Sequence, residues 1–401
     1  MSGGLAGFST RHQLAAYSPI TLHALVAGAR ALAGGGATHE HLCGLLCARF
    51  DAGAATLTGS GTQALQVAMQ VARTSLGTDA SIALPAFGCY DLASAAVGAG
   101  GSVHLYDVDP GTLAPDVDSL EQVMAAGARV VVIAPLYGVP VPWELLEASA
   151  RRFGAILIED AAQGHGAVWR NRPLGNWGRL SVLSFGRGKG WTGGTGGALL
   201  VRGGTSADGV MLEAARGSLS TALALAAQAV LGRPSVYGLP RRLPFLGLGE
   251  TVYHAPSSPR RMTAVAAGVV RATEAASDAE AWARRRNAAA LSARLREYGV
   301  IRMISVDPDA SPGYLRLPLR LSGGWRSIGA DGRASRLGLA PSYPMVLRDV
   351  SALASQLAGV ERSYPGAEAL VAELVTAPTH SLVRGSEHDA IVAFLGGFSI
   401  R

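Results

Sequence analysis

Short apolar runs alternate with helical stretches between residues 55 and 201, and this alternation restricts the fold more than any other feature of the sequence. The apolar runs predict strands at 55–58, 81–84, 103–106, 130–134, 155–158, 179–185 and 197–201. The periodic segments between them predict helices at 63–76, 91–98, 117–126 and 143–152. Continuously apolar strands that alternate with helices are typical of a mostly parallel sheet with helices on both faces. We therefore predict an α/β fold built on a mostly parallel seven-stranded sheet.

The pattern changes after residue 202. Gly, Pro and Arg become frequent between 203 and 260, and much of this segment is predicted to be loop. Further along, residues 262–298 predict one long helical region, 314–321 a strand and 387–395 a final helix. We predict a large domain over residues 1–250 and a smaller C-terminal α+β domain over residues 251–401.

The composition describes a well-buried globular protein, with 49% hydrophobic and 16% charged residues. The formal net charge is +6, but the arginines are scattered and no basic stretch is interleaved with aromatic residues, so we expect no nucleic-acid partner. Three cysteines are too few for a disulfide framework, and the N-terminus lacks the pattern of a signal peptide, so we expect a cytoplasmic protein. The most apolar stretch, 219–231, is too short to span a bilayer and has no basic face. We expect it to be a buried helix or a subunit contact, without membrane insertion.

One lysine, Lys189, stands among the 35 basic residues of the chain. Only lysine among the basic side chains supplies a primary amine that can form a Schiff base. It lies in the glycine-rich stretch SFGRGKGWTGGTGG (184–197), which partly resembles a phosphate-binding P-loop. That motif fails twice, because Leu183 occupies its first glycine position and Gly190 follows the lysine where Ser or Thr is required. Schiff-base chemistry is therefore favoured over nucleotide hydrolysis.

The stretch GSGTQAL (59–65) follows a predicted strand and begins a predicted helix. Backbone amides in a glycine-rich turn at a helix N-terminus bind phosphate, and Gly61 and Thr62 occupy that place. The stretch also fits the dinucleotide fingerprint, which requires an acidic residue after the next strand. Here the next strand ends in Pro85-Ala86-Phe87. A phosphate site without ribose recognition is the better interpretation, and a tight turn that binds no ligand remains the alternative.

The stretch AILIEDAAQGHGA (155–167) is an apolar strand that ends in two carboxylates. Ligands bind at the carboxyl ends of strands in open parallel sheets. Asp160 at such an end could pair with a protonated ring nitrogen, and Gln163 could hydrogen-bond an oxygen of the same ring. A helix cap is the plainer interpretation of the acidic pair. The nearby phosphate turn and Lys189, with Ser184 five residues before the lysine, favour a site.

His39, Cys43 and Cys47 recur every four residues and would share one helix face, with His41 close by. This is the one cluster of the sequence whose spacing resembles that of metal ligands. Cysteines on an apolar helix face are more often structural, so we predict no metal site.

In these elements, taken in order, the chain resembles the DegT/StrS family of sugar aminotransferases, which are fold-type-I enzymes that use pyridoxal 5'-phosphate (PLP). The resemblance begins near 18–32, includes SGTQAL (60–65), EDAAQGHGA (159–167) and SFGRGKG (184–190), and extends to YPGAEALVAELVTAPTH (364–380). It implies a large PLP-binding domain and a smaller C-terminal domain, in agreement with the predicted division at residue 250.

The resemblance also implies roles for single residues. Lys189 would form the Schiff base with the cofactor and then act as the catalytic base. Asp160 would bind the pyridine nitrogen and Gln163 the ring or its phenolic oxygen. The phosphate would be bound by the backbone amides of Gly61 and Thr62 and by the hydroxyl of Ser184.

The sequence departs from the family pattern at two places. The family has an aromatic residue that stacks on the cofactor ring, whereas this chain reads PAFGCYD (85–91), with Cys89 at that position and Tyr90 one residue later. We assign the stacking role to Tyr90, which requires a bulge because a one-residue offset reverses a side chain. The family's Asn, which reaches the cofactor of the neighbouring subunit, is replaced by Pro259. Arg187 or Arg216 is the candidate replacement for that contact.

The expected function is transfer of an amino group from glutamate or glutamine to a keto sugar. The resemblance suggests a nucleotide-linked sugar from surface polysaccharide or specialised-metabolite biosynthesis. The diphosphate of such a sugar could be bound by arginines that are scattered in the sequence: Arg241, Arg242, Arg260 and Arg261. A homodimer is expected, because active sites of this fold form at the subunit interface. The alternatives are a noncatalytic scaffold or ligand sensor and a PLP enzyme that does not transaminate.

Overall fold

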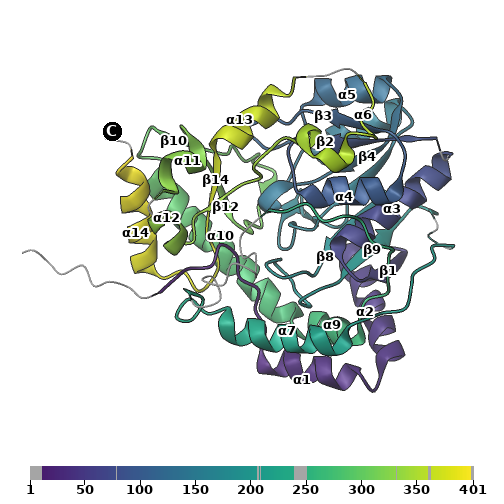
Figure 1. Ribbon diagram of the computed structural model, residues 1–401, viewed down its shortest axis with the longest axis horizontal. Helices are drawn as coiled ribbons and strands as arrows, with labels where there is room; N and C mark the ends of the chain where they lie inside the picture. The colour runs from purple at the N-terminus through teal and green to yellow at the C-terminus, as the bar shows by residue number, and fades with distance from the viewer. Residues whose placement is uncertain are drawn as a thin grey trace, which may run out of the picture.

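The computed structural model describes residues 11–77, 79–205, 207, 209–238, 251–330, 332–359 and 363–398. These residues form a large unit around a seven-stranded sheet and a smaller unit around a four-stranded antiparallel sheet (Figure 1). The predicted α/β fold is confirmed.

The large sheet contains the seven strands that the sequence predicts. They are β1 (Ala54–Thr58), β2 (Ser81–Pro85), β3 (Val103–Tyr106), β4 (Ala128–Ile133), β5 (Ile156–Asp160), β8 (Leu180–Ser184) and β9 (Gly197–Val201). Their order is β1-β9-β8-β5-β4-β2-β3, and β9 runs antiparallel to both of its neighbours while the other pairs are parallel. The sheet is therefore mostly parallel, as predicted.

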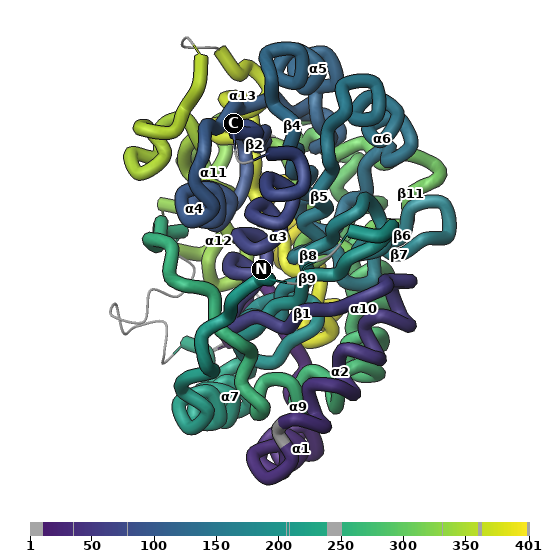
Figure 2. The backbone as a smooth tube through the Cα atoms, turned by 90° about the vertical axis from the view of Figure 1, so that its right-hand side faces the viewer, coloured from purple at the N-terminus to yellow at the C-terminus, as the bar shows by residue number. Residues whose placement is uncertain are grey.

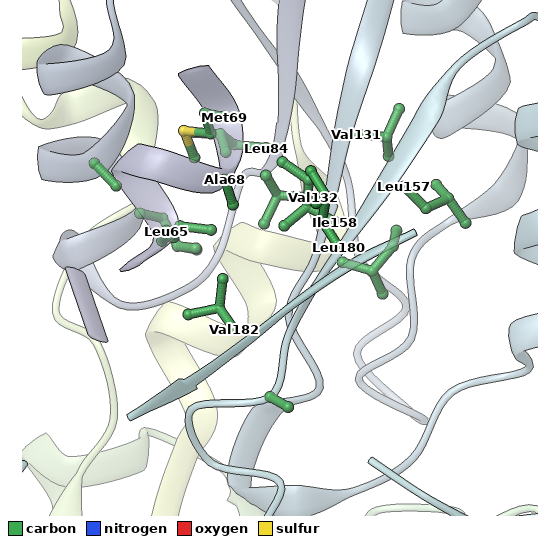
Figure 3. Close-up of a cluster of buried hydrophobic side chains, with 14 of the residues drawn as sticks. Leu65, Ala68, Met69, Leu84, Val131, Val132, Leu157, Ile158, Leu180 and Val182 are labelled. Carbon is green, nitrogen blue, oxygen red and sulfur yellow. The ribbon is translucent and has the colours of Figure 1, made fainter. Parts of the chain in front are cut away.

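Helices cover both faces of this sheet because its strands are apolar on both sides. They are α3 (Gly61–Leu76), α4 (Tyr90–Ala99), α5 (Val117–Ala125) and α6 (Trp143–Arg152). Leu65, Ala68 and Met69 of α3 face the side chains of Leu84, Val132 and Ile158 in the strands, whereas Val131 and Leu157 point to the opposite face (Figure 3). This alternation along β4 and β5 places buried residues on both faces and fixes the register of the sheet.

The smaller unit follows the large one in the chain. Its sheet has the order β10-β12-β14-β13, with β10 (Ile301–Met303), β12 (Leu317–Leu321), β13 (Ala340–Pro341) and β14 (Leu374–Ala377). The surrounding helices are α10 (Glu274–Leu295), α11 (Gly324–Ile328), α12 (Arg333–Arg336), α13 (Pro365–Glu373) and α14 (Gly385–Gly396). A three-stranded sheet of β11 (Ala310–Ser311), β6 (Val168–Trp169) and β7 (Arg172–Pro173) joins the two units.

The prediction of one long helix over 262–298 is wrong. The segment forms α9 (Ala264–Ala272) and α10, and the chain changes direction at Thr273. The hydroxyl of Thr273 donates to the carbonyl oxygens of Val269 and of Thr192, in a different loop. These bonds to the end of α9 and to a neighbouring loop hold the break in place.

Helix α9 packs against α1 (Leu22–Ala31), α2 (Gly35–Phe50) and α7 (Ser218–Leu231), and these helices lie together at one end of the molecule (Figure 2). Met262, Ala266 and Val270 belong to the same core as the large sheet. The predicted division at residue 250 stays a prediction, and this packing favours a start of the smaller unit after α9. Among the described helices, none has the length and apolar content needed to cross a membrane.

Candidate functional site

A pocket lies where the carboxyl ends of β5 and β8 meet the beginning of α3. Its walls include six of the predicted site residues: Gly61, Thr62, Asp160, Gln163, Ser184 and Lys189. These residues are spread over more than a hundred positions of sequence. The parallel strands bring them together, because the carboxyl ends of such strands lie at one edge of the sheet.

The glycine-rich turn between β1 and α3 is built to leave space. Ser60 is the N-cap of α3, and its hydroxyl accepts a hydrogen bond from the backbone N–H of Gln63 at 3.1 Å. A Cβ atom added at Gly61 would lie 2.5 Å from the Cβ atom of Ser184. Because the first N–H groups of a helix have no intrahelical partner, Gly61 and Thr62 can offer theirs to an anion beside the Ser184 hydroxyl.

Lys189 is held by its backbone, which leaves its side chain available to the pocket. Its N–H donates to the carbonyl oxygen of Gly186 at 3.2 Å, and its own carbonyl oxygen accepts from the hydroxyl of Ser18 at 2.6 Å. Thr192 closes the same loop by donating to the carbonyl oxygens of Phe185 and Gly186. The glycines around the lysine therefore allow the backbone to form this tight loop.

Asp160 ends β5 and accepts a hydrogen bond from the N–H of Ala162 at 3.0 Å. Burial raises the pKa of Asp160 above its ordinary value, and the positive charge of Lys189 partly offsets this rise. A cationic ligand group that paired with Asp160 would favour the ionised form further. The carboxylate is therefore suited to bind a protonated ring nitrogen.

The adjacent Glu159 has a structural role. Its side chain is fully buried and accepts hydrogen bonds from the N–H groups of Gly175 and Trp177 and from the hydroxyl of Ser181. Burial raises the pKa of Glu159 to about 7, against the opposing effect of these donors and of Arg202. The two acidic residues at the strand end thus have different surroundings, and only Asp160 lines the pocket.

Gln163 is oriented by two hydrogen bonds. Its Oε1 accepts from the N–H of Tyr137 at 2.9 Å, and its Nε2 donates to the hydroxyl of Tyr343 at 2.8 Å. The hydroxyl of Tyr137 in turn lies 2.5 Å from that of Ser342. Sequence reasoning missed Tyr137, Ser342 and Tyr343, because no local pattern marks residues that meet only across the two units.

The structure does not bring Tyr90 to the pocket. Its side chain is buried in the core of the large unit, whereas Cys89 lines the pocket. The thiol of Cys89 lies 3.5 Å from the carboxylate of Asp91, which also lines the pocket and which sequence reasoning missed. Burial raises the pKa of Cys89 to about 12, so this thiol is neutral near pH 7. The position at which the sequence comparison with the family expects an aromatic residue therefore presents a small neutral group to the pocket.

The predicted arginines fall in different places. Arg216, Arg260 and Arg261 line a second recess, to which Gly59 and Gln63 of the glycine-rich turn also contribute. Arg187 is exposed in the lysine loop, and Pro259 precedes Arg260 at the edge of that recess. Arg241 and Arg242 lie outside the described residues.

The histidine and cysteine cluster lies on α2. His39 Nε2 is 2.8 Å from the carbonyl oxygen of Met262, and the thiol of Cys43 lies 3.3 Å from the carbonyl oxygen of Ala55. Both side chains thus contact the backbone of other segments, which accounts for them structurally.

These groups fit pyridoxal phosphate. The pocket combines a primary amine, a carboxylate at a strand end, an amide with a fixed orientation, and a helix N-terminus at which Gly61 leaves room for an anion. In this order, the four protein groups are suited to bind the aldehyde, the ring nitrogen, the phenolic oxygen and the phosphate of that cofactor.

Comparisons with known proteins agree with this geometry. The chain is 32% identical to an L-glutamine:2-deoxy-scyllo-inosose aminotransferase of Streptomyces kanamyceticus over 141 residues. These residues make up 35% of this chain and 33% of that protein. The protein of the same name from Streptomyces lividus is 27% identical over 281 residues, which is 70% of this chain and 60% of that protein. The match thus spans less than two thirds of the length of these relatives.

The fold is also that of solved aminotransferases. The structure resembles the aminotransferase TlmJ from Streptoalloteichus hindustanus with a TM-score of 0.75 and 21% identity, covering 97% of this chain and 100% of that chain. A sequence model of the DegT/DnrJ/EryC1/StrS aminotransferase family matches residues 25–396. Family membership implies a fold-type-I architecture with pyridoxal phosphate as the cofactor. The chain belongs to the DegT/DnrJ/EryC1/StrS aminotransferase family.

Proposed function

We propose that this chain is a PLP-dependent aminotransferase that moves an amino group from glutamate or glutamine to a keto sugar or a related keto cyclitol. The proposal depends on one observation: the same pocket is lined by Lys189, Asp160 and Gly61. Relatives named as glutamine:inosose aminotransferases support both the donor and the polyhydroxylated acceptor.

When bound, pyridoxal phosphate withdraws electrons from the carbon atom that carries the amino group. Asp160 strengthens this effect by holding the ring nitrogen protonated. Lys189 would hold the cofactor through its Nζ atom, and the same amine would serve as the base that takes up and returns a proton. Gln163 orients the ring through an amide that Tyr137 and Tyr343 fix. The helix N-terminus at Gly61 binds the phosphate.

We further propose that the acceptor is nucleotide-linked and that its product enters surface polysaccharide or specialised-metabolite glycosides. The recess of Arg216, Arg260 and Arg261 supports an anionic substrate, because its described lining residues include three arginines and no acidic residue. Glu213, outside this lining, pairs with both Arg216 and Arg260.

A homodimer is part of the proposal, and α7 supports it. Leu219, Leu223 and Val230 of this helix are 73%, 63% and 65% exposed, whereas Leu225 packs against α1 and α9. A helix that is apolar on all sides is stable only when both of its faces are covered. A second copy of the chain, placed next to the arginine recess, would cover the outer face.

The test of the activity is a visible absorption spectrum of the purified protein with added PLP. We expect a band from cofactor bound to the wild type, no such band in Lys189→Ala, and loss of the band when glutamine or glutamate is added. Return of the band on addition of a keto sugar or keto inositol would identify the acceptor.

Two other results would contradict the proposal. Failure to bind PLP at any concentration indicates a noncatalytic scaffold or ligand sensor. A band that donors change while no keto acceptor restores it indicates a PLP enzyme that does not transaminate.

A further inference from the structure

Residues 11–20 form an N-terminal strap that runs from the smaller unit to the lysine loop, which connects β8 and β9. At its beginning, the strap is bonded to the smaller unit. The N–H of Gln13 donates to the carbonyl oxygen of Arg336 at 2.9 Å, and Nε2 of His380 lies 2.9 Å from the carbonyl oxygen of Leu14. Gln13, Leu14 and His380 are all buried, so the first half of the strap has a fixed path.

The other end of the strap is fixed by the large unit. Ile20 is buried and belongs to one apolar cluster with Leu225 of α7 and Val269 of α9. The next residue, Thr21, begins α1, and its hydroxyl accepts a hydrogen bond from the N–H of Ala24 at 3.1 Å. Because helix α1 starts at a capped position and its neighbour Ile20 is packed, the strap is held at both ends.

Ser18 joins the strap to the lysine of the pocket. Its side chain is buried, and its hydroxyl donates to the carbonyl oxygen of Lys189 at 2.6 Å. The N–H of Lys189 donates within its own loop, to the carbonyl oxygen of Gly186. Within the part of the chain that the structure describes, Ser18 is therefore the one residue outside the loop that hydrogen-bonds the backbone of Lys189.

The lysine loop depends on contacts of this kind because glycines stand on both sides of the lysine. Gly188 has a φ angle of 77°, which a residue with a side chain rarely adopts. Gly190 is confined by packing, since a Cβ atom there would lie 2.9 Å from Nη2 of the buried Arg284. The loop is thus fixed by packing at Gly190 and by the hydroxyl of Ser18 at Lys189.

We propose that Ser18 is a positioning residue for Lys189. The amine of a lysine lies at the end of a flexible four-carbon chain, so its place depends on the place of the backbone that carries it. A misplacement of about 1 Å can slow an enzymatic reaction by about 100-fold. The inference rests on the proposed function, in which Lys189 is the base. It adds to the site a residue that lies 171 positions from the lysine in the sequence.

The first test compares the PLP-loaded wild type with Ser18→Ala in single-turnover measurements of each half of the reaction. We expect the rate constants of both halves to fall by about 10-fold, because the same lysine serves as the base in each. The half-saturating concentrations of glutamine and of the keto acceptor should stay unchanged, since Ser18 holds the lysine and not a substrate. A residue that only stabilises the fold would not separate these two parameters.

The second test requires neither cofactor nor turnover. Hydrogen–deuterium exchange of the apo protein, measured on peptides that cover residues 184–197, reports how often the lysine loop opens. We expect exchange in these peptides to be about 3- to 10-fold faster in Ser18→Ala, because the loop loses one hydrogen bond to the strap. Exchange in strand β4, at the centre of the sheet, should equal that of the wild type.

Thr21→Ala is the matched control. It removes a hydroxyl three residues after Ser18, but this hydroxyl bonds to the N–H of Ala24 and caps α1. We expect the control to lower the stability of the protein through the lost cap. It should change neither the two rate constants nor the exchange of the lysine loop. The same changes in Thr21→Ala as in Ser18→Ala would overturn the inference.

Two further results would overturn it: unchanged exchange of the lysine loop in Ser18→Ala, or faster exchange with unchanged rate constants. Failure of the proposed function gives a different result, because the wild type itself would then fail to bind PLP or to transfer an amino group. The exchange of the apo protein still decides in that case whether Ser18 holds the backbone of Lys189.

Discussion

Gly61 and Ser184 approach so closely that a Cβ atom at position 61 would lie 2.5 Å from the Cβ atom of Ser184 and 2.6 Å from its hydroxyl oxygen. The first belongs to the helix N-terminus after β1 and the second ends β8. The absence of a side chain at Gly61 therefore allows a helix N-terminus and a hydroxyl group to face one anion.

Replacing Gly61 by Ala should disturb both the fold and the phosphate site. We expect a loss of about 1–3 kcal/mol in the free energy of unfolding, because the new methyl group overlaps Ser184, and a fall in PLP affinity. Denaturant titration and a PLP binding curve measure the two effects. Gly44→Ala is the matched control, because its helical site has open space, and it should stabilise the protein slightly. This explanation requires the double variant with Ser184→Gly to recover part of the free energy of unfolding, whereas PLP affinity should stay low because the Ser184 hydroxyl is lost.

The affinity for PLP should depend on pH through Asp160. The protonated carboxyl cannot pair as an anion with a protonated ring nitrogen, so affinity should fall as the pH drops through the pKa of Asp160. Burial raises that pKa, so the fall should begin at a higher pH than for an ordinary aspartate. Spectroscopic binding curves recorded between pH 4 and 8 measure how the PLP affinity depends on pH. Asp160→Asn should bind weakly at every pH, and a wild-type profile that is equally flat would contradict the role of the carboxylate.

The adjacent Glu159 should affect folding and leave cofactor chemistry unchanged. Glu159→Gln replaces a carboxylate oxygen by an N–H₂ group among three hydrogen-bond donors, so we expect a loss of about 1–3 kcal/mol in stability. Thermal unfolding of the apo protein measures the loss, and the absorption spectrum with saturating PLP should equal that of the wild type. A changed spectrum would show that Glu159 acts on the cofactor.

Cys89 should limit how tightly the ring is held. A thiol covers less of an aromatic face than a ring does, and aromatic pairs contribute about 0.5–1.5 kcal/mol beyond the buried area. We therefore expect Cys89→Phe to tighten PLP binding by about 2- to 10-fold, with Cys89→Ala as the control that adds no ring. Weaker binding by Cys89→Phe would mean that the pocket needs the small side chain to admit its ligands.

The apolar face of α7 should control assembly. A charge at Leu223 would be buried in the proposed subunit contact, so we expect Leu223→Glu to be monomeric by analytical ultracentrifugation. Leu145→Glu, at an exposed leucine of α6, is the control and should leave the assembly unchanged. If Leu223→Glu and the wild type have the same mass in solution, α7 does not form the contact.

The sequence by itself determined the alternation of strands and helices in the large unit. It also marked Lys189, Asp160 and the turn at Gly61, because each has a local signature: a lone amine in a glycine-rich loop, a carboxylate after an apolar run, and glycines before a helix. Hydrophobic periodicity is short-ranged, so strands such as 103–106 and 197–201 could be located to the residue.

Only the tertiary structure decided which side chains meet. Gln163 is bonded to Tyr343, 180 residues further along the chain, and nothing near Tyr343 in the sequence signals that contact. The direction of the side chains at Cys89 and Tyr90 depended on how the chain enters α4, and the break at Thr273 depended on a carbonyl of another loop. Periodicity reports on local burial, whereas the composition of a site follows from packing between segments that are distant in sequence, and packing is a property of the folded chain as a whole.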